Sequence, residues 1–231
     1  MMRTLKQTDI GRLIRLQDTV LSSMEDPSLL RKNTYETFLF CFERPRYAVG
    51  IFDGENLVSA CIFVDAYGTE EDLSRSLKNT VCTKPINYKL VLVHPDYRGH
   101  GWQRFLFMIC AKLAWKDGYE QIIATAAPAN TYSCQNMLRM GMKEDHRELK
   151  YGGLLRCVMV LDQKVRRNHE PMHYEEECGS ADRSLCFDGV KVCYEAGEGI
   201  VHGSDVIGAE TRIPLNKLSE GNYLLLFPKA D

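Results

Sequence analysis

The chain has 231 residues and a mass of 26.4 kDa, enough for one large domain or for a medium domain and a small one. With 45% hydrophobic, 26% charged and 10% aromatic residues, its composition excludes the disordered, collagenous and disulfide-rich classes. The formal net charge of -2 hides an asymmetry: residues 166–231 hold 7 Lys and Arg against 12 Asp and Glu, which leaves 22 basic and 19 acidic residues, or +3, in residues 1–165. Neither part has the basic density of a nucleic-acid binder, so no nucleic-acid partner is expected.

Nine cysteines are scattered between Cys41 and Cys193 without a CxxC pair, so the sequence predicts neither a disulfide framework nor a zinc ribbon. A cytoplasmic, reducing location fits this usage best. No apolar segment follows the first four residues, so no signal peptide is expected. The uncharged apolar run 105–111 is far shorter than the roughly 20 residues of a membrane helix, so no membrane partner is expected either.

Two helices are predicted at the start of the chain. Asp9 precedes apolar residues that recur at three- and four-residue intervals, which predicts a helix capped by Asp9 and ending near Pro27. A second, shorter helix is expected around residues 34–42.

A hairpin and an insertion follow. Residues 47–52 and 57–64 flank the turn dipeptide Asp53-Gly54 and predict two antiparallel strands. Residues 65–87 are polar and charged, with one helical turn expected at residues 73–77. This segment is interpreted as an insertion.

A strand, loop, helix and strand come next. Residues 89–93 predict a compact apolar strand, and residues 102–116 predict a helix with one apolar face. Gly118 closes that helix, and residues 121–125 resume as a strand.

Another helix is expected from Asn130 to about Met140, where Gly141 ends it, and residues 156–161 predict a last strand. The alternation of helices and strands favours the α/β (α+β) class, with a mixed sheet and helices on its faces.

The C-terminal part is interpreted as a separate region. The charge run 164–168 and the acidic stretch 175–177 are typical of a linker. Short β-like segments follow at 184–187, 190–194 and 223–227. We therefore predict one domain over residues 1–165, and a linker with a small β-rich region of unknown function over residues 166–231.

The most informative stretch, residues 91–103, places glycines between a buried strand and a helix. The first-turn N–H groups of a helix have no internal partner, and Gly99 and Gly101 remove the Cβ atoms that would keep a pyrophosphate away. Arg98 adds a permanent charge. Taken alone, this pattern is more typical of an ordinary glycine turn with a surface arginine, and it is neither a P-loop nor a Rossmann motif.

In its full context this segment resembles the acetyl-CoA motif of the GCN5-related N-acetyltransferase (GNAT) superfamily, a strand followed by V-x-P-x-x-(Q/R)-G-x-G and a helix. The residues that match it are Val93, Pro95, Arg98, Gly99 and Gly101. Downstream, Asn130, Ser133 and the pair Gly141-Met142 match the N-x-x-(A/S), helix, Gly-Phe pattern. The resemblance extends over roughly residues 3–162 and is strongest to uncharacterised bacterial members with a late KYGGLLR segment, here residues 150–156.

The resemblance implies the GNAT fold, a mixed and mostly antiparallel sheet with helices on both faces, and acetyl-CoA as co-substrate. It also implies a splayed junction between the strands 89–93 and 121–125. Backbone groups of the first strand would pair with the pantetheine arm, and N–H groups of residues 99–104 would hold the pyrophosphate. The cofactor-binding residues it implies are Val91, Leu92, Val93, Arg98, Gly99, His100, Gly101, Trp102, Gln103, Arg104, Asn130 and Ser133. Gln103 departs from the usual Gly or Ala and would slightly crowd the helix start.

Acyl transfer to an amine needs a neutral nucleophile, and deprotonating an amine with a pKa of about 10.4 costs roughly 4 to 5 kcal/mol at pH 7. The Glu and Tyr that many relatives use are replaced here by Lys89 and Met137. Tyr132 is the candidate catalytic residue that could substitute as general acid, although a core or surface role is the more common one for such a residue. Tyr151 and His146 are further candidates, and water-relayed deprotonation is the alternative to a dedicated base.

The sequence therefore predicts an acetyl-CoA-dependent N-acyltransferase that moves an acetyl group to a primary amine of a small molecule or peptide. The alternative is a catalytically weak acyl-CoA-binding module that acts through a protein partner. The sequence does not determine the oligomeric state, and a homodimer is one of the options it leaves. In the tail, five residues could bind zinc, but their spacing matches no standard pattern, so no metal is expected. They are His169, His173, Cys178, Cys186 and Cys193.

Overall fold

The computed structural model describes residues 2–81, 84–99 and 101–163, together with the backbone of four short strands between residues 185 and 213. The helices of the first region are α1 (Ile10–Ser22), α2 (Tyr35–Phe42), α3 (Trp102–Lys116) and α4 (Thr131–Arg139). Its strands are β1 (Met2–Thr4), β2 (Arg46–Asp53), β3 (Asn56–Val64), β4 (Pro85–Val93), β5 (Gln121–Ala126), β6 (Lys143–Lys150) and β7 (Leu154–Asp162).

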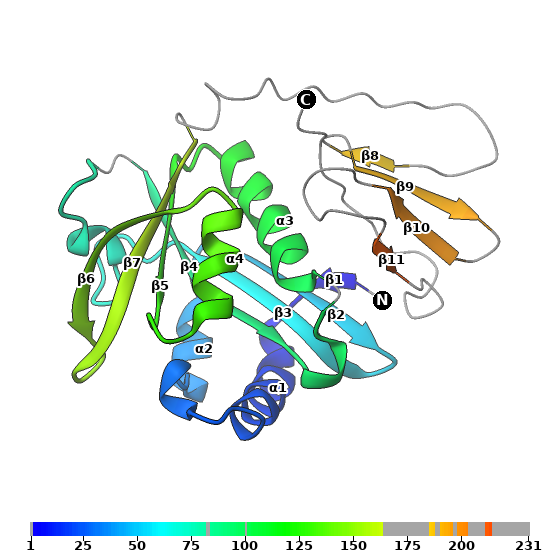
Figure 1. The fold of residues 1–231 in the computed structure, drawn as a ribbon, viewed down its shortest axis with the longest axis horizontal. Coiled ribbons are helices and arrows are strands. Elements are labelled where there is room, and N and C mark those ends of the chain that lie inside the picture. The colour runs from blue at the N-terminus through cyan, green and yellow to red at the C-terminus, as the bar shows by residue number, and fades with distance from the viewer. Residues whose placement is uncertain are drawn as a thin grey trace.

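These seven strands form one sheet in the order β1-β2-β3-β4-β5-β7-β6 (Figure 1). Neighbours pair antiparallel except β4 and β5, which are parallel. The predicted class, a mixed and mostly antiparallel sheet with helices, is confirmed.

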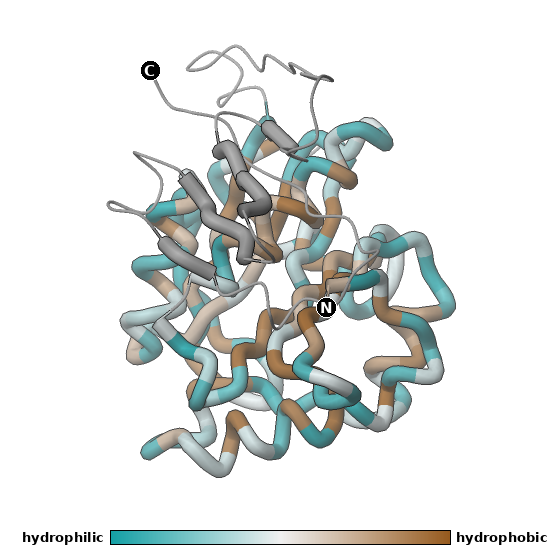
Figure 2. Tube along the Cα trace, turned by 90° about the vertical axis from the view of Figure 1, so that its right-hand side faces the viewer, coloured by the Kyte–Doolittle hydropathy of each residue, from teal (hydrophilic) through white to brown (hydrophobic). Residues whose placement is uncertain are grey.

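The helices cover both faces of the sheet, each with its own apolar core. On one face α1 and α2 bury Leu13 and Phe38 against Ile62 of β3. On the other, α3 and α4 bury Phe107 and Met137 among side chains of β3, β4 and β5. Figure 2 shows the hydrophobic residues gathered along the interior segments and the hydrophilic ones along the outer turns. Sandwiching the sheet in this way explains why its central strands are apolar on both sides.

Several predicted boundaries are confirmed. Helix α3 spans the predicted residues 102–116, and the β2–β3 hairpin turns at Gly54 with a φ of 57°. Thr34 caps α2 by accepting a hydrogen bond from Thr37 N–H at 3.3 Å. The expected turn in the insertion is the 3-10 helix Leu73–Ser76. Glycine, caps and apolar periodicity were therefore reliable local signals here.

The prediction that Asp9 caps α1 through its side chain is wrong. Asp9 stands at the N-cap position, but its carboxylate makes no capping bond there. It is 1% exposed and accepts two hydrogen bonds of 2.7 Å from Arg3 on β1 and one of 2.9 Å from Lys6 N–H. The charged guanidinium outcompetes the helix N–H groups because charge-assisted bonds are the stronger ones. Helix α1 also ends at Ser22, before Pro27.

Residues 144–148 lie in β6, a strand that the sequence did not predict and that pairs with β7 over the whole hairpin. The strand reads Lys-Glu-Asp-His-Arg-Glu-Leu-Lys and shows no apolar alternation. β6 is the edge of the sheet, where charged side chains are tolerated and protect against pairing with other chains. Strand β1, at the opposite edge, was not predicted either.

Strand β4 begins at Pro85, four residues earlier than predicted, and its two halves behave differently. Its first half pairs with β5 only from Pro85–Gln121 to Asn87–Ile123. Its second half continues alongside β3 to Val93 and leaves β5. The register also slips, because Tyr88 and Leu90 oppose the consecutive residues Phe63 and Ile62, so Lys89 is the extra residue of a β-bulge. The strands therefore splay apart from Lys89 onward, as the resemblance implied.

In the C-terminal region, the described strands β8 (Leu185–Phe187), β9 (Val190–Glu195), β10 (Glu198–His202) and β11 (Thr211–Ile213) form a second sheet in the order β11-β10-β9-β8. Two of them match the expected β-like segments at 184–187 and 190–194. The third segment, 223–227, lies outside the described residues, and the domain boundary at residue 165 stays a prediction.

Candidate active site

A cavity of about 1020 Å³ opens where β4 and β5 splay apart. Its walls come from the end of α1, the second half of β4, the first turns of α3 and α4, and residues of β5 and β7. The described residues expected to bind a cofactor all line it, as does Tyr132. They are Val91, Leu92, Val93, Arg98, Gly99, Gly101, Trp102, Gln103, Arg104, Asn130 and Ser133. His100 lies outside the described residues.

The first turn of α3 faces this cavity. Gly101 is the N-cap residue with a φ of 72°, and Gly99 has a φ of 85°. Side chains rarely adopt such φ values, which explains glycine at both positions. No atom lies within 4 Å of the point where a Cβ on Gly99 would stand. The start of α3 thus borders the cavity, and because the first N–H groups of a helix have no partner within that helix, this arrangement suits an anion.

Three arginines add positive charge beside this turn. Arg104, in the first turn itself, has a buried Nε without a hydrogen-bond partner among the described residues. Burial, and secondarily the nearby Arg139 of α4, lowers the pKa of Arg104. Arg98 donates to Ser23 Oγ at the end of α1 at 3.0 Å. Cations at a helix N-terminus oppose the helix dipole, so this cluster is favourable only with an anion bound.

The start of α4 forms the adjoining wall. Asn130 Oδ1 accepts a hydrogen bond from Ser133 N–H at 3.1 Å and so caps the helix. Gln103 does not disturb the start of α3, contrary to the expected crowding, because its Oε1 accepts a 2.8 Å bond from Asn136 Nδ2 and ties α3 to α4. Tyr132 lies at the cavity wall with 82% of its surface exposed.

A charged cluster that the sequence did not reveal lines the other end of the cavity. Arg31 donates to both oxygens of Glu71 at 2.9 and 2.7 Å, and Lys89 Nζ donates to Glu71 Oε2 at 2.8 Å. Burial alone would raise the pKa of Glu71, but the hydrogen bonds from the two cations outweigh it and lower the pKa to about 2. Glu71 is therefore ionised at neutral pH and is a poor proton acceptor.

Tyr151 and Arg156 complete this end of the cavity, which we call the basic end: Arg31, Glu71, Lys89, Tyr151 and Arg156. Tyr151 has a φ of 52°, the only positive value of a described residue other than glycine. Its hydroxyl lies 3.1 Å from Thr125 Oγ1 on β5, and the Arg31 guanidinium lies 4.1 Å from its ring centroid. Non-glycine residues hold such backbone conformations mostly at functional sites.

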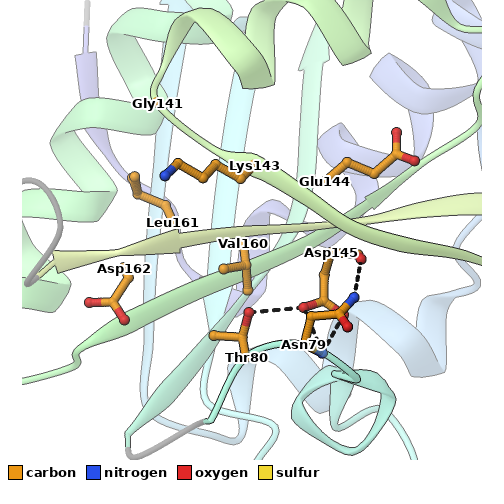
Figure 3. A pocket seen from close by; sticks show the side chains of 9 residues that line it. All are labelled: Asn79, Thr80, Gly141, Lys143, Glu144, Asp145, Val160, Leu161 and Asp162. Carbon is orange, nitrogen blue, oxygen red and sulfur yellow. Dashed lines mark hydrogen bonds between the residues drawn. The ribbon is translucent and has the colours of Figure 1, made fainter.

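A second, smaller cavity of about 280 Å³ lies at the β6–β7 edge (Figure 3). The carboxylate of Asp145 occupies one side and accepts hydrogen bonds from Lys78 N–H at 2.9 Å, Asn79 N–H at 3.2 Å and Thr80 Oγ1 at 2.9 Å. His146, a further candidate for the general acid, contacts the same carboxylate through Nδ1 at 2.8 Å. Neither Asp145 nor His146 lines the large cavity. Because Asp145 belongs to β6 and its hydrogen-bond donors belong to the insertion, this cluster ties the insertion to the sheet.

Within the described part of the chain, no group of three or more His, Cys, Asp or Glu side chains could hold a metal ion. The five tail residues considered as zinc ligands have side chains outside that part. Among the described helices, none combines the length and apolarity needed to span a membrane.

Comparison with known proteins gives a structural likeness and no sequence likeness. No protein-family model and no curated protein matches the sequence. Among solved structures, an N-acetyltransferase from Staphylococcus aureus Mu50 aligns over 71% of this chain and 98% of its own, with 14% identity and a TM-score of 0.53. A putative acetyltransferase from Salmonella typhimurium, solved with its cofactor acetyl-CoA, aligns over 77% and 98%, with 15% identity and a TM-score of 0.54.

The ribosomal-protein-S18-alanine N-acetyltransferase of Escherichia coli aligns over 70% of this chain and 92% of its own, with 14% identity and a TM-score of 0.52. The architecture is thus that of a splayed α/β sheet covered by helices on both faces. More specifically, the chain has the GNAT fold, and the fold implied by the motifs at residues 93–101 and 130–142 is confirmed.

Proposed function

We propose that this protein is an N-acyltransferase that binds acetyl-CoA in the large cavity and transfers its acetyl group to a primary amine of a small molecule or peptide. The observation that carries the proposal is the first turn of α3. There, the start of a helix, two glycines with positive φ, and an arginine whose Nε has no hydrogen-bond partner among the described residues line one cavity that continues to the splayed strands.

The residues present fit the chemistry of coenzyme A. Pyrophosphate would bind the N–H groups of residues 99–104, with charge supplied by Arg98 and Arg104. Pantetheine would run along Val91–Val93, where β4 has lost β5 as its ladder partner, and would add hydrogen bonds as an extra strand does. Solved structures of the same fold contain acetyl-CoA or coenzyme A, which supports this assignment.

The basic end of the cavity suits the acceptor amine. Arg31, Lys89 and Arg156 bring three positive charges against the single carboxylate of Glu71. Nearby positive charge disfavours the ammonium form, so the site would lower the pKa of a bound amine. This supports deprotonation by electrostatics and water, without a dedicated carboxylate base.

Two tyrosines are candidates for the proton donor to the leaving thiolate. Tyr132 lies at the exposed wall, whereas Tyr151 places its hydroxyl beside Thr125 on β5. A thiol-release assay with a panel of amines tests both through Tyr132→Phe and Tyr151→Phe. The variant that lowers kcat at unchanged acetyl-CoA affinity identifies the donor, and full activity in both means that water supplies the proton.

The same assay tests the proposed function. Turnover should disappear in Arg98→Glu and persist in Arg15→Glu, a matched charge reversal on the exposed face of α1 that lies outside the cavity. Acetyl-CoA binding without release of thiol for any amine would favour the alternative, a binding module. That alternative is supported by Lys89 and the buried Met137, which occupy the positions of the usual Glu and Tyr.

A cytoplasmic location and a domain boundary belong to the same proposal. Cys41, Cys61, Cys110 and Cys157 are buried free thiols. Burial raises the pKa of Cys41 to about 11 and that of Cys157 to about 12, so both behave as core residues and not as reactive thiols. We place the end of the acyltransferase domain near residue 165, just after β7 ends at Asp162.

A further inference from the structure

We infer that the acceptor of this enzyme carries an anionic group, a carboxylate or a phosphate, in addition to its amine, and that Arg156 at the basic end of the cavity binds it. The inference rests on the proposed function. It narrows the acceptor from any primary amine to amino-acid-like or phosphorylated amines, and it disfavours polycations such as polyamines and aminoglycosides.

The first observation is that Arg156 is buried without a carboxylate partner among the described residues. It is 4% exposed, yet it lines the cavity. Its guanidinium donates to two backbone carbonyls, Leu155 O and Ser28 O, both at 3.0 Å. No carboxylate of the described residues lies within ion-pair distance of it. A buried guanidinium without a carboxylate is costly, and an anionic ligand is what would compensate it.

The carboxylates near Arg156 are engaged elsewhere. Glu148 is its cross-strand neighbour on β6, but it accepts a 2.9 Å hydrogen bond from Lys150. Glu71 is held by two other cations. Asp26, at the exposed rim, accepts a hydrogen bond from Ser28 N–H at 2.9 Å. Tyr151 raises the pKa of Arg156, but burial lowers it and dominates, as expected for a desolvated cation lacking a counter-ion.

The second observation is the charge balance of the basic end. Arg31 and Lys89 share one carboxylate, so that triad already has an excess positive charge before Arg156 is added. A ligand with one amine and one anionic group would neutralise this excess. A second ammonium group would add to it. The cavity therefore discriminates by charge as well as by shape.

The third observation is location. Arg156 lies on β7, next to Cys157, which pairs with Ala126 at the end of β5. Thr125, the residue before Ala126, has its Oγ1 3.1 Å from the hydroxyl of Tyr151. The anion would thus bind on the strand next to β5, where Ala126 lies three residues beyond Ile123, the last residue of β5 that pairs with β4.

Matched acceptor pairs test the inference: tyrosine against tyramine, tryptophan against tryptamine, and phosphoethanolamine against ethanolamine. Each pair differs only by the anionic group. We expect kcat/KM at least about 10-fold higher for the anionic member of a pair, since hydrogen bonds to charged groups are the stronger ones. The amino-acid and phosphate arms show which anion is preferred.

Variants connect the preference to Arg156. Arg156→Gln should raise KM for the anionic acceptor about 10-fold or more and should change KM for the partner without the anionic group much less, and Arg156→Lys should restore part of the loss. Arg147→Gln, an exposed position on the same hairpin, is the control. Because Arg156 also holds Ser28 O, each variant is first checked by thermal unfolding with acetyl-CoA bound.

The inference is overturned, and the proposed binding of acetyl-CoA stands, if protein that binds acetyl-CoA gives one of three results. It acetylates both members of each pair equally, it prefers the member without the anionic group, or it acetylates neither member. If the protein fails to bind acetyl-CoA, the proposed function itself is wrong. Should Arg156→Gln fail to fold, the matched pairs measured on the unaltered protein still decide.

Discussion

Glu71 illustrates how one side chain sets the electrostatics of the basic end. Its carboxylate bridges Arg31 from the loop before α2 and Lys89 from the bulge of β4. In this way it fixes the insertion onto the sheet and supplies a carboxylate partner to Lys89, whose side chain is only 8% exposed. The residue works as a counter-ion, and its low pKa removes it as a catalytic base.

This predicts a pH dependence of stability. The pKa of Glu71 falls from 4.5 to about 2 on folding, so the pair stabilises the native state above pH 4.5, and this contribution is lost as the pH falls from 4.5 toward 2. Glu71→Gln should therefore be less stable than the unaltered protein at pH 7 and nearly equal to it at pH 2. Denaturant unfolding at several pH values measures this. A difference that stays constant across the range would contradict the assignment.

Gly99 provides the second test at this scale. Gly99→Ala places a Cβ in the open space before α3 and strains a φ of 85°, at about 1 to 2 kcal/mol. Gly68→Ala is the matched control, because Gly68 has a φ of 78° and equally open surroundings but does not line the cavity. Both variants should lose similar stability by thermal unfolding. Only Gly99→Ala should weaken acetyl-CoA binding, and equal binding by both would argue against this turn as the pyrophosphate site.

At the scale of elements, the position of β4 decides most of the site. It pairs with β5 for three residues, slips its register at Lys89 and then follows β3 alone. The bulge places Lys89 at the cavity wall, and the cavity opens where the two strands part. The segment 78–80 is likewise held to the edge strand β6 by Asp145.

Asp145 gives a prediction for that edge. Asp145→Ala removes the acceptor of three hydrogen bonds and should cost about 1 to 3 kcal/mol, with faster amide exchange in residues 78–80. Its neighbour Glu144 forms an exposed ion pair with Arg147, so Glu144→Ala should cost less than about 1 kcal/mol. Unchanged exchange in Asp145→Ala would mean that the segment is held by other contacts.

The sequence was informative where a local pattern has one structural solution. The apolar face of residues 102–116, Asn130 as a cap, and Gly118 as a C-terminal residue with a φ of 81° could all be predicted. Strand β6 could not, because an edge strand made of charged residues lacks the alternation that identifies strands. The ion pairs of Glu71 could not either, since nothing local relates residue 71 to residues 31 and 89.

At the scale of the whole molecule, the charge asymmetry divides the chain where the sheet ends. The net positive residues 1–165 contain the described sheet and its cavity, while residues 166–231 carry a net charge of -5. An anionic ligand such as acetyl-CoA fits the positive part. The observation gives the acidic part no role in binding that ligand.

A truncated protein of residues 1–165 should therefore unfold cooperatively and bind acetyl-CoA within about threefold of the full chain, because a domain with its own core folds as a unit. Circular dichroism and calorimetry measure the two properties. A truncated protein that folds but binds much more weakly would show that the C-terminal region contributes to the site.

Calorimetric titration of the full chain with acetyl-CoA tests the central claim most directly. We predict saturable binding at one site. Affinity should fall about 10-fold or more in Arg104→Glu, since a guanidinium in the first turn of α3 is replaced by a carboxylate that repels the anionic ligand. It should be nearly unchanged in Arg15→Glu, which makes the same change of charge away from the cavity. No binding at near-millimolar acetyl-CoA, or an equal effect of the two variants, would contradict the account.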